Sequence, residues 1–154
     1  MSNAGYELPL LLFGGFRVII DELHAELARR GHADLRPAHG FAMQAIGFGG
    51  ATASDVGRRL GISKQAAGKT VDRLEALGYV HRASDDADRR RKLVRLTAHG
   101  IEALTLSAMI FSDIQARWAR TLGPARLDDL EASLRTMVPG DTFRLDVPGW
   151  FGVG

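Results

Sequence analysis

The sequence predicts a mainly α-helical protein with one small β-hairpin, and three observations support this fold class. Apolar residues recur every three or four positions on both sides of the chain's middle, which is typical of packed helices. Two short helical patterns within residues 52–77 are joined by a tight turn at Gly61-Ile62. Two strand patterns follow, Tyr79–Ala83 and Lys92–Leu96, separated by a charged tip. We therefore expect a winged helix-turn-helix lobe attached to a helical dimerisation region.

The first helix is expected over Leu10–Arg30, with apolar residues at 12, 16, 19, 20, 23 and 27. Gly31 and the polar residues after it end this helix, and Pro37 at a first-turn position begins a second helix that runs to Ile46.

A glycine-rich linker, residues 47–50, leads into the lobe. No Lys-Ser/Thr pair follows it and no strand precedes it, so we do not interpret it as a phosphate-binding loop. Thr52 and Asp55 have the spacing of a capping box at the start of the next helix.

After the hairpin, Thr97 can cap a long helix from about Ala98 to Leu122, with apolar residues at 101, 104, 108, 111, 114, 118 and 122. Gly123-Pro124 ends it and begins a last helix. A long apolar stripe needs a partner surface, so we expect a homodimer built from the N- and C-terminal helices.

The expected organisation is a helical dimerisation region of residues 8–36 and 98–138, a winged helix-turn-helix lobe of residues 37–97, and a tail of residues 139–154. The tail is rich in Pro and Gly but carries four large apolar residues, Phe143, Leu145, Trp150 and Phe151. It is either disordered or docked across the dimer or over a pocket. We favour docking, because solvated chain ends rarely keep so many large apolar groups.

Charge is concentrated in the lobe. Residues 58–95 hold 11 of the 20 Lys and Arg residues but only five of the 18 acidic ones, a local charge of +6 in a chain of +2. This distribution suits a polyanion, because neutralising phosphates releases counterions. The chain has no cysteine, which excludes disulfides and thiol redox sensing, and we expect a cytoplasmic protein. The apolar stretch Leu8–Ile20 is too short and too interrupted to span a membrane or to serve as a signal peptide.

The second helix of a helix-turn-helix enters the major groove of DNA with its N-terminal residues facing the bases. The residues expected to face DNA from this helix are Ser63, Lys64, Gln65, Lys69, Thr70 and Arg73. Gln65 can pair with adenine, and a lysine with guanine or phosphate. Ser63 is also the natural N-cap, so its hydroxyl has an alternative partner in the backbone. Gly68 is costly inside a helix, and a close approach of DNA or of a neighbouring helix would explain it.

The hairpin tip combines acidic residues with four consecutive basic residues, which suits insertion into a narrow minor groove. The tip residues expected to act in DNA binding are Asp88, Arg89, Arg90 and Arg91. Asp88 stands two positions before Arg90 and could hold that guanidinium in place.

The segments LGISKQAAGKTVDRLEALGYVHR and DDADRRRKLVRLTAHG resemble the MarR family of transcriptional regulators. The resemblance covers residues 36–122 and includes an Asp-x-Arg wing signature at Asp88 and Arg90 and a Leu-Thr-x-x-Gly helix start at Leu96, Thr97 and Gly100. It implies an interlocked helical dimer, with Arg90 in the minor groove, Asp88 orienting it, and Ser63–Lys69 reading the major groove. It also implies a repressor that binds a pseudopalindromic operator and is released by a small, often aromatic, effector.

An effector pocket would lie among the first two helices, the long helix and the base of the wing. Its expected lining residues are Phe13, Arg17, His24, Met43 and Trp118, with Phe16 and Phe41 as further candidates. Arg17 is a lone charge in an apolar stripe. It could bind a carboxylate ligand, although an ion pair with Asp21 one turn away is the explanation we favour.

Other classes of function have little support in the sequence. The five histidines show no H-x₃-H or HExxH spacing, so we expect no metal and no cofactor, and any metal site would need residues brought together by folding. No catalytic motif is present, and we do not expect an enzyme. The remaining alternative is a winged-helix interaction module or small-molecule-binding protein without specific DNA recognition, which would have no need of the +6 charge.

Overall fold

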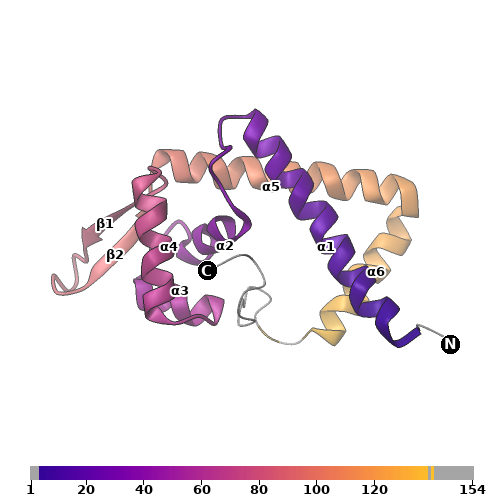
Figure 1. The fold of residues 1–154 in the computed structure, drawn as a ribbon, viewed down its shortest axis with the longest axis horizontal. Coiled ribbons are helices and arrows are strands. Elements are labelled where there is room, and N and C mark those ends of the chain that lie inside the picture. Colours follow the sequence, from indigo (N-terminus) through magenta and orange to yellow (C-terminus); the bar gives the residue numbers. More distant parts are fainter. Residues whose placement is uncertain (1–3, 139, 141–154) are drawn as a thin grey trace.

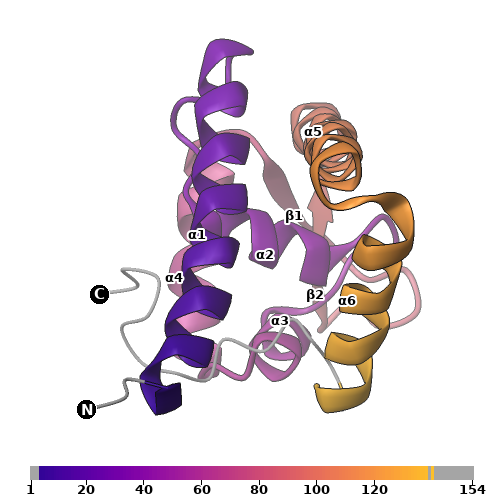
Figure 2. The same cartoon turned by 90° about the vertical axis from the view of Figure 1, so that its right-hand side faces the viewer.

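A computed structural model of the chain, which describes residues 4–138 and 140, has six helices and a two-stranded antiparallel sheet in that part (Figure 1). The elements in chain order are α1 (Ala4–Arg29), α2 (Pro37–Ile46), α3 (Ala53–Leu60), α4 (Lys64–Ala76), β1 (Val80–Ser84), β2 (Lys92–Leu96), α5 (Ala98–Leu122) and α6 (Pro124–Met137). α5 crosses α1, carries the lobe of α2–α4 and the wing at its N-terminal end, and leads to α6 at its other end (Figures 1 and 2). The predicted fold class is confirmed.

The helix-turn-helix forms where its capping residues predict. The Thr52 hydroxyl accepts a hydrogen bond from the Asp55 amide (3.0 Å), and the Asp55 carboxylate accepts one from the Thr52 amide (3.1 Å). α3 ends at Gly61, whose φ of 69° is left-handed and favours glycine. The Ser63 hydroxyl then caps α4 by accepting a hydrogen bond from the Ala66 amide.

The wing is a short hairpin whose register runs from Val80 opposite Leu96 to Ser84 opposite Lys92. Ala51, at the end of the glycine-rich linker, exchanges two backbone hydrogen bonds with Val94 and so ties the linker to the sheet. The first strand begins one residue later than predicted. The cause is that the amide of Tyr79 donates to the carbonyl of Leu74 and completes the last turn of α4.

The core lies where α2, α3, α4 and the wing base meet α1 and α5. The buried face of α5 differs in part from the prediction, because it consists of Gly100, Ala103, Ser107, Ile110 and Ile114. Of the predicted stripe, Ile114 is buried but Ile101 is 40% exposed. Small residues face the lobe because the backbones meet closely: a Cβ on Gly100 would lie 2.2 Å from the Tyr79 carbonyl oxygen.

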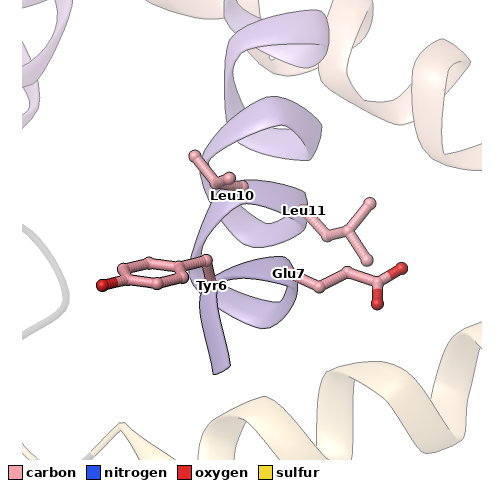
Figure 3. Close-up of a pocket in the computed structure, with 4 residues that line it drawn as sticks. All are labelled: Tyr6, Glu7, Leu10 and Leu11. Carbon is pink, nitrogen blue, oxygen red and sulfur yellow. The ribbon is translucent and has the colours of Figure 1, made fainter. Parts of the chain in front are cut away.

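α1 begins six residues before the predicted start, and Pro9 lies within its N-terminal turns. Leu8, Leu10, Leu11 and Leu12 are all exposed there, by 46–66%. Tyr6, Glu7, Leu10 and Leu11 line a shallow open hollow on this part of α1 (Figure 3). No helix in the described part of the chain has the length and apolar character needed to cross a membrane. The tail expectation concerns Phe143 to Phe151, which lie outside the described residues.

Candidate DNA-binding interface

α4 is held with one face in the core and the other in solvent. Ala67, Val71 and Leu74 are fully buried and fix the rotation of the helix. The predicted contact residues Ser63, Lys64, Gln65, Lys69 and Arg73 are exposed on the opposite side, and Thr70 is half-buried. Ser63 caps the helix, and the Thr70 hydroxyl donates to the Ala66 carbonyl (3.2 Å). The side chains of Lys64, Gln65, Lys69 and Arg73 are therefore better placed than the two hydroxyls to contact a ligand.

Gly68 lies on the open side of α4. A Cβ placed on it would meet no atom of the described chain within 4 Å, so packing inside this chain does not require a glycine there. Of the two explanations offered by the sequence, a neighbouring helix of the same chain is therefore excluded. A close approach by something outside the chain remains.

Arg82 fixes the base of the wing to α4. Its guanidinium donates to Asp72 Oδ1 (2.7 Å) and Glu75 Oε1 (3.1 Å), and its backbone amide donates to the other Glu75 oxygen (3.1 Å). The single charge of Arg82 offsets one of the two negative charges in the second half of α4. The cationic side chains at the start of α4 therefore keep their positive field.

The wing tip is organised by Asp88, but not as predicted. Its carboxylate accepts a hydrogen bond from the Arg90 backbone amide (3.0 Å) rather than from the guanidinium, and its carbonyl accepts from the Arg91 amide. The acceptor sits two residues before the amide and so closes a tight turn. In the described part of the chain, the exposed side chains of Arg89 and Arg90 form no ion pair.

Arg91 connects the wing to α3. Its guanidinium lies 3.4 Å from Asp55 Oδ2. The hydrogen bonds from Thr52, together with Arg58 and Arg91, hold the pKa of Asp55 below its ordinary value. Asp55 therefore stays ionised, and it orients Arg91 as well as capping α3.

The predicted effector residues separate into two groups. His24 and Met43 line a small hollow between α1, α2 and α5, together with Phe41. Phe13, Arg17 and Trp118 do not belong to its lining. The ion pair that we favoured for Arg17 is wrong, because its guanidinium lies over the Phe13 ring, 5.9 Å from the centroid, and no ion pair with Asp21 forms among the described residues. Arg17 is exposed, so water also solvates its charge.

Burial lowers the pKa of His24, while a hydrogen bond to the Leu35 backbone and the charge of Asp21 oppose this effect. His24 Nδ1 is buried without a hydrogen-bond partner in the described structure. An unsatisfied buried acceptor costs about 1–3 kcal/mol, so this atom is a natural anchor for a ligand.

The base of the wing also holds a polar cluster that the sequence does not predict. His32, from the turn after α1, and His99, from α5, stack with Tyr79. These residues are far apart in the sequence, and their spacing gives no signal.

Residues 33–91 match the model of the MarR family, a segment that contains the whole helix-turn-helix and the hairpin tip. This part of the chain, about the winged-helix lobe, is therefore similar in sequence to the MarR family. This similarity agrees with the resemblance found in the sequence. A search among curated proteins finds no match.

Solved structures with this MarR fold cover most of the chain. FabT of Streptococcus pneumoniae in complex with DNA has a TM-score of 0.75 and 17% identity, over 86% of this chain and 93% of that one. A mutant of MarR from E. coli, complexed with operator DNA, has a TM-score of 0.70 and 21% identity, over 90% of this chain and 100% of that one. YusO from Bacillus subtilis has a TM-score of 0.63 and 21% identity, over 89% of this chain and 98% of that one. At these identities the likeness establishes the fold.

Proposed function

We propose that this chain is a homodimeric transcriptional repressor that binds a pseudopalindromic DNA operator and releases it when a small effector binds. The observation that carries this proposal is the exposure of the cations at the start of α4 and at the wing tip, while Asp55, Asp72 and Glu75 nearby are paired with arginines. The MarR and FabT structures named above hold DNA with the same fold.

On DNA, Gln65, Lys64 and Lys69 would read or position the major groove, as the start of a recognition helix does. Arg90 would enter the minor groove, where the narrow walls strengthen the negative potential. The Asp88 turn gives the tip a defined shape, which lowers the conformational entropy that Arg90 loses on binding.

Dimerisation would supply the second half-site. One chain exposes apolar side chains on the first half of α1 and along α6, and these two surfaces are set apart in Figure 2. Exposed apolar area of this extent is typical of a protein–protein interface. Two lobes related by a two-fold axis would then face half-sites about 34 Å apart.

The effector would bind at the hollow beside His24. This hollow has only about 20 Å³ of free space, enough for a water molecule, so an aromatic effector must separate α1 and α2 from α5 to enter. The depressed pKa keeps His24 neutral, and its Nδ1 can accept a hydrogen bond from a phenolic hydroxyl. Because α5 continues directly from the wing, this separation would change the position of the lobe.

The decisive experiment measures fluorescence anisotropy of duplex DNA from upstream of the chain's own gene, with random duplex as control, at two salt concentrations. We expect tight, salt-sensitive, sequence-selective binding with two chains per duplex. Arg90→Ala should lose about 1–3 kcal/mol of binding, whereas Arg29→Ala, whose guanidinium pairs with Glu26 on α1, should bind like wild type. Equal, weak binding to both duplexes would favour the interaction-module alternative, and full affinity of Arg90→Ala would refute the role of the wing.

A further inference from the structure

Folding brings three potential metal ligands together at the junction of the helical frame and the wing. His32 lies in the turn between α1 and α2, and His99 and Glu102 lie in the first turns of α5. One ligand atom from each residue lies within 4.8 Å of the other two. His32 is 2% exposed, whereas the side chains of His99 and Glu102 are 42% and 66% exposed. The group therefore has a buried inner ligand and an open outer side.

The hydrogen bonds around His32 prepare it as a ligand. The Tyr79 hydroxyl donates to Asp34 Oδ1 (2.8 Å) and lies 2.9 Å from His32 Nδ1. A tyrosine hydroxyl carries a single proton. Since that proton goes to Asp34, the hydroxyl can only accept from His32, which places the His32 proton on Nδ1. Nε2 then carries a free lone pair.

Metal-bound histidine commonly donates its other ring N–H to a carboxylate, a backbone carbonyl or water. Here a tyrosine hydroxyl, itself bonded to a carboxylate, takes the place of that partner. It fixes the tautomer and the ring plane and raises the basicity of the ligand nitrogen. Asp34, Tyr79 and His32 have this order.

The ligand types indicate the class of metal. Two imidazoles and one carboxylate suit Zn²⁺ and similar divalent d-block ions, whereas Mg²⁺ and Ca²⁺ prefer oxygen ligands. Ligands at about 2.0–2.2 Å from a tetrahedral zinc lie roughly 3.3 Å from one another. His99 Nδ1 is already 3.7 Å from Glu102 Oε2. The separations that involve His32 are at most 4.8 Å, and rotation of the exposed His99 and Glu102 side chains can shorten them.

We propose that His32, His99 and Glu102 bind one divalent transition-metal ion of the zinc type, with a fourth position open to water. The ion would join the turn after α1 to the start of α5, next to the first strand of the wing. This site is separate from the hollow beside His24 and from the cationic surface, and its existence does not depend on DNA binding.

The test is calorimetric titration of ZnCl₂ into protein from which any affinity tag has been removed. We expect one ion per chain with a Kd of micromolar order or tighter, and a higher melting temperature with zinc. His99→Gln should abolish this binding, and Glu102→Gln should weaken it at least tenfold, because the amide oxygen is uncharged. His81→Gln is the matched control, since His81 is exposed on β1, and it should bind zinc like wild type.

A further variant tests the outer shell without removing a ligand. Tyr79→Phe keeps the ring but removes the hydroxyl, and it should lower zinc affinity by about 10–100-fold. Circular dichroism of the zinc-free protein would establish that the variant folds. The proposal is overturned if wild type takes up no stoichiometric zinc at 100-fold higher concentration than the expected Kd. It is equally overturned if His99→Gln and Glu102→Gln bind as wild type does, or if His81→Gln loses as much affinity as they do.

Discussion

At the scale of single residues, Gly68 shows how a locally unfavourable choice can indicate an external contact. Glycine inside a helix costs about 1 kcal/mol relative to alanine. Nothing in the described chain occupies the space beside its Cα, and the neighbouring residues Lys64, Gln65 and Lys69 are exposed. We infer that the missing side chain leaves room for DNA.

Gly68→Ala should therefore separate stability from binding. We expect the free energy of unfolding, measured with urea, to rise by up to about 1 kcal/mol, and DNA affinity, measured by anisotropy, to fall about tenfold or more. Gly40→Ala is the matched control, because Gly40 is also inside a helix with no atom near its missing Cβ. It should gain similar stability and keep full affinity. Unchanged affinity in Gly68→Ala would mean that DNA does not approach this position.

At the scale of elements, the sequence was most informative where a local rule determines a boundary. Thr52, Ser63 and Thr97 are the N-caps of three helices, as predicted, because an N-cap acts within three residues. The faces of α5 were predicted less well. Apolar residues occur on more than one side of that helix, and periodicity alone does not tell which side meets the core. The side of α5 with Gly100 and Ala103 is buried because the Tyr79 backbone lies against it.

The candidate DNA-binding interface was likewise predicted only in part. The residues that face outward from α4 followed from the fold class, because its apolar residues define the buried face. The partners of charged side chains did not follow. Asp88 closes a backbone turn and Arg17 lies over Phe13, since each side chain has several partners within reach and tertiary packing selects one. The cluster of His32 with His99 depended on contacts between distant segments.

The start of α2 gives the fold a dependence on pH. His39 Nδ1 accepts a hydrogen bond from the Arg36 amide (3.1 Å). Burial is the largest cause that lowers the pKa of His39, followed by the positive charges of Arg73 and Arg36. The charge of Asp34 raises this pKa, and that of His24 lowers it. The ordinary pKa of histidine is about 6.5. As the pH falls below this value, His39 is protonated in the unfolded chain while it is still neutral in the folded state. The stability from His39 is therefore present at neutral pH and is lost as the pH falls toward its lowered pKa.

Urea unfolding at pH 7.5, 6.5 and 5.5 should show this loss as a falling midpoint. His39→Gln keeps an acceptor at the cap but does not titrate, so its midpoint should fall less over the same range. Burial also lowers the pKa of His24, so some dependence will remain. His81→Gln, at an exposed position, should behave like wild type. An identical pH dependence in His39→Gln and wild type would contradict the role of this cap.

At the scale of the whole molecule, the arrangement of apolar side chains makes a single chain incomplete. α1 and α6 each contact α5 but stand apart from each other, and both carry exposed leucines at the end of the molecule away from the wing (Figures 1 and 2). The exposed cations of α4 and the wing tip lie at the other end, on the lobe. Under the proposed function, one end of the chain would dimerise while the other end binds DNA.

Leu11→Glu and Leu134→Glu should each convert the protein to a monomer at micromolar concentration in sedimentation, because a buried unpaired carboxylate is costly. Phe48→Glu is the control, since Phe48 is 74% exposed but lies in the linker between α2 and α3, and it should remain dimeric. On a duplex with two half-sites, the monomeric variants should lose far more affinity than on a duplex with one, because linkage of the two lobes makes the second contact intramolecular. Wild type that sediments as a monomer would refute the dimer. Equal losses on both duplexes would mean instead that the substitutions disturb the lobe itself.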